Sequence, residues 1–206
     1  MIHPKYININ RILGAMTFLI SFIVYFDTMA PSVSYWDCGE FIAVSYTLGV
    51  PHPPGSPLFL LLGRIASMLP ISEDIAFRVN LLSPLASAFS VLFLYFIIVQ
   101  LVNHWRGKIE TNTDALIAFG AGIVGSLTFA FTDSHWFNAV EAEVYAFSTF
   151  FTAIVVWLAL LWSEKANEKG NERYILIIAY MIGLATGLHL LNLLTIPFVA
   201  LLIYFK

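Results

Sequence analysis

The sequence predicts an all-α polytopic membrane protein with about six transmembrane helices, and three observations support this fold class. Hydrophobic residues make up 59% of the 206 residues. Charged residues make up 11%, where a typical soluble domain has about 25%. The apolar residues also form long uncharged runs, several of them close to the roughly 20 residues that a helix needs to cross a bilayer.

The composition excludes several other classes of protein. A soluble domain of this size could not hide so large an apolar share from water. A disordered chain would be rich in charge and poor in hydrophobic residues. The net charge of −3 provides no basic surface for nucleic acid, so no nucleic-acid partner is expected.

The uncharged runs are interpreted as membrane spans within a single domain over residues 1–206. Helices are expected because backbone groups in lipid must pair within their own segment. The predicted spans cover approximately residues 10–27, 77–102, 114–132, 144–163, 174–189 and 190–205.

One apolar run, residues 58–69, is too short to be a span. Its 12 residues make a helix of about 18 Å at 1.5 Å per residue, and Arg64 lies in its middle. We therefore expect an interfacial or re-entrant helix inside a long first loop, residues 28–76, which carries short helices.

The distribution of Lys and Arg predicts the orientation of the spans. With a cytoplasmic N-terminus, eight of the ten basic residues lie on the cytoplasmic side, and only Arg64 and Arg78 lie on the other. Basic residues in short loops favour the cytoplasm. The loop 28–76 is therefore predicted to be extracytoplasmic.

The first loop contains the most distinctive polar residues. Asp37 and Glu40 form a D-x-x-E pattern before an apolar run, which predicts a capping box that starts a helix. The same geometry would hold a carboxylate in a fixed rotamer, as a general base requires. His52 lies in the proline-rich turn 51–57 and is either a ligand, a proton carrier or a hydrogen-bonded loop residue.

Further candidates come from the same predicted face. Glu141 and Tyr145 would share a helix face at i, i+4, with Glu143 pointing elsewhere. His189 and Asn192 would share a face if the helix continues through the third turn, either as a functional pair or as helix-to-helix hydrogen bonding. Arg78 either snorkels or clamps an anionic head group or pyrophosphate. The candidate substrate-binding residues are thus His52, Arg78, Glu143, Tyr145, His189 and Asn192.

Three of these segments resemble a known family. They are Asp37-Cys38-Gly39-Glu40, the run LGVPHPPGSPLF over residues 48–59, and Glu143-Val144-Tyr145. Together they look like the signature of the "domain of unknown function 2723" family, which is similar to protein O-mannosyltransferases and other GT-C glycosyltransferases. The resemblance covers essentially the whole chain and the N-terminal part of the family's usual length.

The resemblance implies an enzyme of GT-C type. Such an enzyme transfers a sugar from a polyprenyl-phosphate-linked donor to a protein or glycan hydroxyl at the extracytoplasmic face. Asp37 would be the catalytic base and Glu40 its partner, with His52 and Glu143 as further members of the site. The turn at His189 would meet the donor phosphate.

Metal dependence is left open by the sequence. Hard carboxylates suit Mg²⁺ or Mn²⁺, so Asp37 and Glu143 are the candidate ligands of a bridging cation. Some GT-C relatives need a metal and others do not. The identity of the sugar and of the acceptor also stays open.

Two other functions remain as alternatives. Ionisable residues at the membrane edge and helices broken by Gly or Pro would suit a transporter, although the spans hold almost no charge. GT-C modules usually share at least seven spans, so a chain with six is expected to be a truncated enzyme or a non-catalytic membrane subunit. Such a chain would have the bilayer as a partner, together with a further membrane subunit or a missing C-terminal part.

Overall fold

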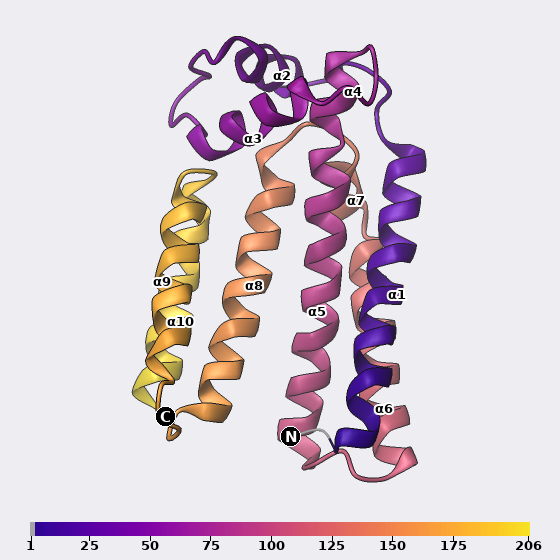
Figure 1. Cartoon of the computed structure of the whole chain (residues 1–206), viewed down its shortest axis with the longest axis vertical. Coiled ribbons are helices and arrows are strands. Elements are labelled where there is room, and N and C mark those ends of the chain that lie inside the picture. Colours follow the sequence, from indigo (N-terminus) through magenta and orange to yellow (C-terminus); the bar gives the residue numbers. More distant parts are fainter. Residues whose placement is uncertain (1–2) are drawn as a thin grey trace.

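The structure is a computed structural model that describes residues 3–206. Every regular element in these residues is a helix, as the sequence predicts (Figure 1). The elements are α1 (Pro4–Thr28), α2 (Cys38–Thr47), α3 (Pro57–Met68), α4 (Ile75–Asn80), α5 (Leu82–Arg106), α6 (Asn112–Ala130), α7 (Asp133–Ala139), α8 (Val144–Lys165), α9 (Glu172–Thr186), η1 (Leu190–Leu194) and α10 (Thr195–Tyr204).

The long helices run along one axis of the molecule, with the start of α1 and the C-terminus at its lower end in Figure 1. We call this lower end the terminal end. The opposite end carries α2, α3 and α4 above the helix bundle, and we call it the loop end.

Four helical stretches are long and apolar enough to cross a membrane: α1, α4 with α5, α6 and α8. They match the predicted spans 10–27, 77–102, 114–132 and 144–163. The last two predicted spans correspond to α9, with 15 residues, and to the short apolar stretch Leu190–Tyr204. Both run beside α8 in Figure 1, but they fall below the usual spanning length, so six spans remain a prediction.

The second span is interrupted at Leu81, between α4 and α5. Pro84 lies in the first turn of α5 and has no N–H to donate to the carbonyl of Asn80, four residues earlier. The Asn80 side chain is fully buried and donates to the carbonyls of Ala30 and Ser32, each at 2.8 Å. These two bonds tie the region of the break to the chain that leaves α1.

Helix α5 forms the centre of the bundle, because α1, α6 and α8 all pack against it. The approach of α6 depends on Gly122, where a Cβ atom would lie 2.8 Å from the Tyr95 ring and from Val99. Small residues at such positions allow membrane helices to pack closely.

At the loop end, α3 contacts α2 on one side and the turn after α9 on the other. Gly63 of α3 lies so close to Ser45 of α2 that an added Cβ would be 2.8 Å from the Ser45 Cβ. At the start of α3, the Leu58 N–H donates to the Gly187 carbonyl and the Ser56 hydroxyl donates to the Leu188 carbonyl, each at 2.9 Å. The proline-rich turn is thereby held beside the turn that follows α9.

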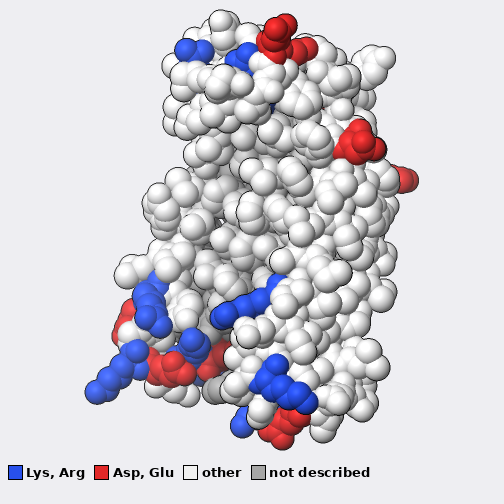
Figure 2. Space-filling view, turned by 45° about the vertical axis from the view of Figure 1, so that its right-hand side comes forward, with Lys and Arg blue, Asp and Glu red and all other residues white. Residues whose placement is uncertain are grey.

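Charged side chains lie mainly at the two ends of the molecule. Figure 2 shows a wide middle band that is almost free of them, with most Lys and Arg below it. Such a band is what the bilayer interior requires. The direction in which the chain crosses the membrane remains a prediction.

Candidate functional site

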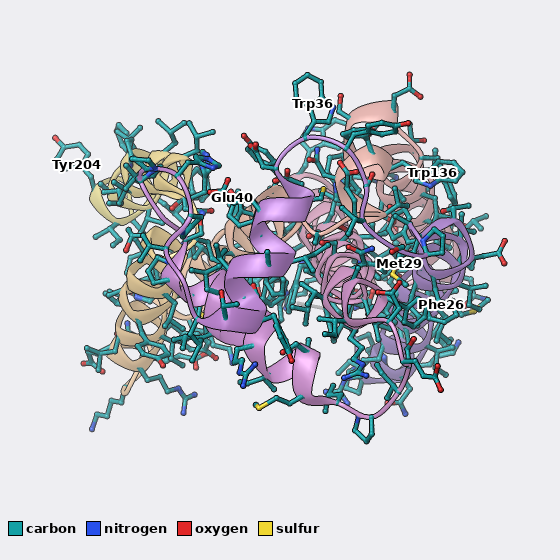
Figure 3. The ribbon with its side chains drawn as sticks, turned by 90° about the horizontal axis from the view of Figure 1, so that it is seen from above. Phe26, Met29, Trp36, Glu40, Trp136 and Tyr204 are labelled. Carbon is teal, nitrogen blue, oxygen red and sulfur yellow. The ribbon has the colours of Figure 1, made fainter. Side chains whose placement is uncertain are left out.

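A polar cluster on the loop end joins the start of α2 to the proline-rich turn. The Glu40 carboxylate accepts two hydrogen bonds from His52, one from its backbone N–H and one from Nδ1, each at 2.7 Å. The other ring nitrogen, Nε2, lies 4.0 Å from the Asp37 carboxylate. Figure 3 looks down on this end and labels Glu40 on α2. Asp37, Glu40 and His52, which the family resemblance assigns to one site, therefore lie together.

The predicted capping box at Asp37 and Glu40 is wrong. Asp37 precedes α2, but its side chain makes no capping hydrogen bond. Its backbone has helical angles, φ −79° and ψ −5°, whereas capping side chains normally sit on an extended backbone. Glu40 binds His52 instead of reaching back to the helix start. The Asp37 side chain, 57% exposed, is thus left facing solvent and the imidazole.

The hydrogen bonds in this cluster favour its charged forms. An ionised carboxylate only accepts hydrogen bonds, so Nδ1 of His52 must carry the proton that it shares with Glu40. This bond raises the pKa of His52 and lowers the pKa of Glu40. The site therefore presents an imidazole that is protonated more readily than usual, beside an open carboxylate.

Glu143 approaches the same cluster from the start of α8. It is the residue before the helix, 6% exposed, and it accepts a 3.3 Å hydrogen bond from the Val144 N–H. Burial, together with the nearby Asp37 and Glu141 carboxylates, raises the pKa of Glu143 to about 7. This carboxyl group can therefore hold or release a proton near neutral pH.

Glu141 is a buried residue of the site that was not selected from the sequence. The expectation that it shares a helix face with Tyr145 is wrong, because α8 begins only at Val144. Glu141 is 3% exposed and accepts a 2.6 Å hydrogen bond from the Ser34 hydroxyl. It thereby joins the first loop to the second. The E-x-E spacing before an apolar run was the sequence signal for this position.

Cys38, at the start of α2, is fully buried behind the cluster. Its burial, with the neighbouring Glu141 and Glu143 carboxylates, raises the pKa of the thiol. The thiol therefore stays protonated and is a poor nucleophile.

Tyr145 and His189 lie together at the third turn. Their ring centroids are 5.2 Å apart, and Nδ1 of His189 accepts a 3.2 Å hydrogen bond from the Leu191 N–H at the start of η1. The helix does not continue through this turn, so His189 and Asn192 do not share a helix face as predicted. The ring of His189 remains beside Tyr145. The proline-rich turn and the start of α3 are hydrogen-bonded to the two residues just before His189.

The side chain of Asn192 is occupied by contacts within the bundle. It donates to the carbonyls of Ala185 and His189, at 3.2 and 3.0 Å. Its Oδ1 accepts from the hydroxyls of Ser148 and Thr152, both at 3.2 Å. The structure thus gives Asn192 the helix-to-helix hydrogen bonding that was one of its two predicted roles.

Arg78 is used to organise the segment between α3 and α4. Its guanidinium donates to the carbonyls of Ser72, Ser67 and Glu73, at 2.6, 2.7 and 3.4 Å. These bonds differ from both roles considered for it, which were snorkelling and clamping a phosphate. They do not bring Arg78 to the Asp37 cluster.

A divalent cation would find a different ligand set from the predicted one. Asp37, Glu40 and His52 each offer a ligand atom, and these atoms all lie within 4.8 Å of one another, whereas Glu143 does not belong to this group. Two carboxylates with one imidazole suit Mn²⁺ at least as well as Mg²⁺. A cation held there would supply positive charge for a phosphate.

Comparison with known proteins finds a matching family and related proteins. The family described as "Protein O-mannosyl-transferase TMEM260 N-terminal domain" matches residues 37–206. "Protein O-mannosyl-transferase tmem260" of Dictyostelium discoideum is 31% identical over 198 residues, covering 89% of this chain and 22% of that protein. "Protein O-mannosyl-transferase TMEM260" of Mus musculus is 29% identical over 162 residues, covering 79% of this chain and 21% of that protein.

The chain therefore spans about a fifth of the length of these curated relatives. No solved structure matches it. The matched region begins at Asp37 and includes the whole polar cluster.

Proposed function

The chain belongs to the protein O-mannosyl-transferase TMEM260 N-terminal domain family, and from this premise we propose that its loop end carries the catalytic residues of a membrane glycosyltransferase. The enzyme would transfer a sugar, in this family a mannose, from a polyprenyl-phosphate-linked donor to a protein hydroxyl. One observation carries the proposal: Asp37, Glu40 and His52 meet at one end of a membrane bundle, with Glu143 beside them.

Asp37 acts as the general base in this proposal. Its carboxylate is exposed and makes no capping bond, so it is available to a substrate. It accepts the proton of the acceptor hydroxyl while that oxygen attacks the anomeric carbon of the donor. The bond from this carbon to the phosphate oxygen breaks, and the polyprenyl phosphate leaves with the bonding electrons.

The neighbouring groups stabilise the leaving phosphate. Glu40 holds His52 by one hydrogen bond to its backbone N–H and one to its ring Nδ1. The ring bond raises the pKa of His52, so the ring can present positive charge. The pKa of Glu143, about 7, allows this buried group to donate a hydrogen bond to the phosphate instead of repelling it. Tyr145 and His189 would contact the donor from the third turn.

The loop end would face away from the cytoplasm. Two of the ten Lys and Arg residues, Arg64 and Arg78, lie at this end. The other eight lie toward the terminal end. The bias supports a cytoplasmic terminal end.

Substitution of Asp37 by Asn tests the proposal in the complete protein. Asn cannot accept the proton, so transfer of labelled mannose from polyprenyl-phosphate mannose should fall by about 10² or more. Folding and membrane yield should stay near those of the wild type, because the Asp37 side chain makes no capping bond.

Asp133→Asn is the matched control, since Asp133 begins α7 as an exposed carboxylate. Its activity should equal that of the wild type. Unchanged transfer by Asp37→Asn would overturn the catalytic role of Asp37.

A further inference from the structure

A cleft of about 430 Å³ opens at the terminal half of the bundle, away from the loop end. Helices α1 and α8 both pack along α5, and α5 forms the floor between them. Asn10 and Arg11 of α1, Gln100 of α5, and Trp157 and Glu164 of α8 line the cleft. Its volume lies in the range of small-molecule sites, about 300–1,000 Å³.

The floor of this cleft and its α1 wall carry polar atoms that the bundle does not satisfy. Both amide atoms of Gln100 and Oδ1 of Asn10 are shielded from solvent, and within residues 3–206 they have no hydrogen-bond partner. Leaving a buried polar group without a hydrogen-bond partner is unfavourable. Gln100 lies six residues before the end of α5 at Arg106, which corresponds to a depth of about 9 Å. A ligand toward which these side chains turn must therefore offer both donors and acceptors.

The charges at the cleft point to a ligand with two opposite charges. Arg11 and Glu164 both line the cleft and are exposed, and no ion pair joins them in the described part of the chain. The Arg11 guanidinium and the Gln100 amide N–H groups can donate to a phosphate. The Glu164 carboxylate and Oδ1 of Asn10 can accept from a primary ammonium.

The apolar wall of the cleft suits acyl chains. Phe96 of α5 and Trp157 of α8 lie with their ring centroids 6.2 Å apart, and both line the cleft. Figure 2 shows charged side chains gathered at the terminal end, below the apolar band. A lipid would place its head group at the level of these charges and its chains along the rings.

We propose that this cleft binds an ethanolamine phospholipid, which carries one phosphate and one primary ammonium. A lipid phosphate without the amine, including the polyprenyl phosphate of the proposed reaction, would place only negative charge beside Glu164. A choline head group would lose the N–H donors that Asn10 and Glu164 require. The inference is independent of the proposed transfer reaction, because the two sites lie at opposite ends of the bundle.

Native mass spectrometry of the purified protein in detergent tests the proposal. The protein is mixed in turn with ethanolamine, choline and glycerol phospholipids of identical acyl chains. Binding of the ethanolamine lipid should be at least tenfold tighter than binding of the other two. Equal retention of all three lipids would overturn the proposal.

Two variants assign the binding to the cleft. Gln100→Leu removes the unsatisfied amide and should fold at least as well as the wild type, while it weakens ethanolamine lipid binding roughly tenfold. Arg11→Gln should weaken it to a similar degree. Glu168→Gln, a charge change at the same end but outside the cleft, should leave binding unchanged. Wild-type affinity in Gln100→Leu would refute the assignment.

A photo-crosslinking residue in place of Leu161, which also lines the cleft, identifies the occupant in membranes. Capture of a phospholipid with a primary amine supports the proposal. Capture of a polypeptide segment would show that a helix fills the cleft, and the proposal would then be wrong.

Discussion

Asn192 should stabilise the contact between α8 and the turn after α9 through two hydrogen bonds, and the one to Thr152 can be measured by a double-mutant cycle. Its Oδ1 accepts from the hydroxyls of Ser148 and Thr152 on α8, both at 3.2 Å. Its Nδ2 donates to two carbonyls, but the Ala185 carbonyl also accepts from the Leu188 and His189 N–H groups. Removing the amide therefore leaves that carbonyl satisfied, and the loss falls mainly on the two bonds to α8.

The expected magnitude is modest. Hydrogen bonds between membrane helices contribute about 0.6 kcal/mol each on average, with a maximum near 1.7 kcal/mol. A double-mutant cycle with Asn192→Ala and Thr152→Val should thus give a coupling energy of about 0.6 kcal/mol. The free energy of unfolding of all four proteins would be measured by reversible unfolding in mixed micelles.

Thr149→Val provides the matched control for this cycle. Thr149 lies one turn earlier on α8, and its hydroxyl donates within the helix to the Tyr145 carbonyl at 2.9 Å. Its coupling to Asn192→Ala should be near zero. A coupling of Thr152 to Asn192 that is no larger than this control value would refute the reasoning.

Three further predictions follow from contacts at the loop end. Gly63→Ala should lower the unfolding free energy by about 1–3 kcal/mol, because its Cβ would lie 2.8 Å from the Ser45 Cβ; thermal unfolding should show recovery when Ser45→Gly is added, and no recovery would exclude this contact as the cause. The pKa of Glu143 is raised from 4.5 to about 7 in the folded protein, so the folded state retains a proton that the unfolded state has lost, and stability should fall as pH rises between these values. Glu143→Gln should remove that part of the pH dependence in unfolding experiments, and an unchanged profile would contradict the assignment. In a Cys38→Ala background, an impermeant thiol reagent added to intact cells should label Val50→Cys and not Glu168→Cys, since these exposed positions lie at the two ends of the bundle; the opposite result would reverse the predicted topology.

The long helices were predictable because hydrophobicity alone determines them. Residues 114–132 and 144–163 were predicted as spans, and α6 and α8 occupy Asn112–Ala130 and Val144–Lys165. Bilayer thickness sets the length of such segments and backbone pairing sets their conformation, so no tertiary contact is needed to predict them. The interruption at Leu81 changes the local geometry without changing the span.

The details of the site depend on contacts that no local rule describes. Asp37 and Glu40 have the spacing of a capping box, yet the partner of Glu40 is His52, twelve residues further along the chain. A capping box does form at the start of α6, between Thr111 and Asp114. A sequence pattern thus gives the available hydrogen bonds, while tertiary packing selects among them.

Contacts between residues far apart in the sequence could not be predicted from it either. Glu141 was evident as an acidic residue, but the Ser34 hydroxyl that it binds lies 107 positions away. Arg78 had two plausible roles, whereas the fold uses it to close the segment after α3. The convergence of Asp37, His52 and Glu143 on one face could be predicted because the order of the spans alone brings their loops to the same end.

The central place of α5 has a consequence for how the chain is assembled during synthesis. Helix α1 packs against α5 and α6, which emerge only after the whole first loop, so it must enter the bilayer before either partner exists. Its buried hydroxyl groups suit that interval: Thr17 donates to the Gly14 carbonyl and Ser21 to the Thr17 carbonyl, both at 2.8 Å and both within α1. A solitary α1 therefore leaves neither hydroxyl unpaired in lipid. Helix α1 can therefore remain in the membrane until α5 is synthesised and packs against it.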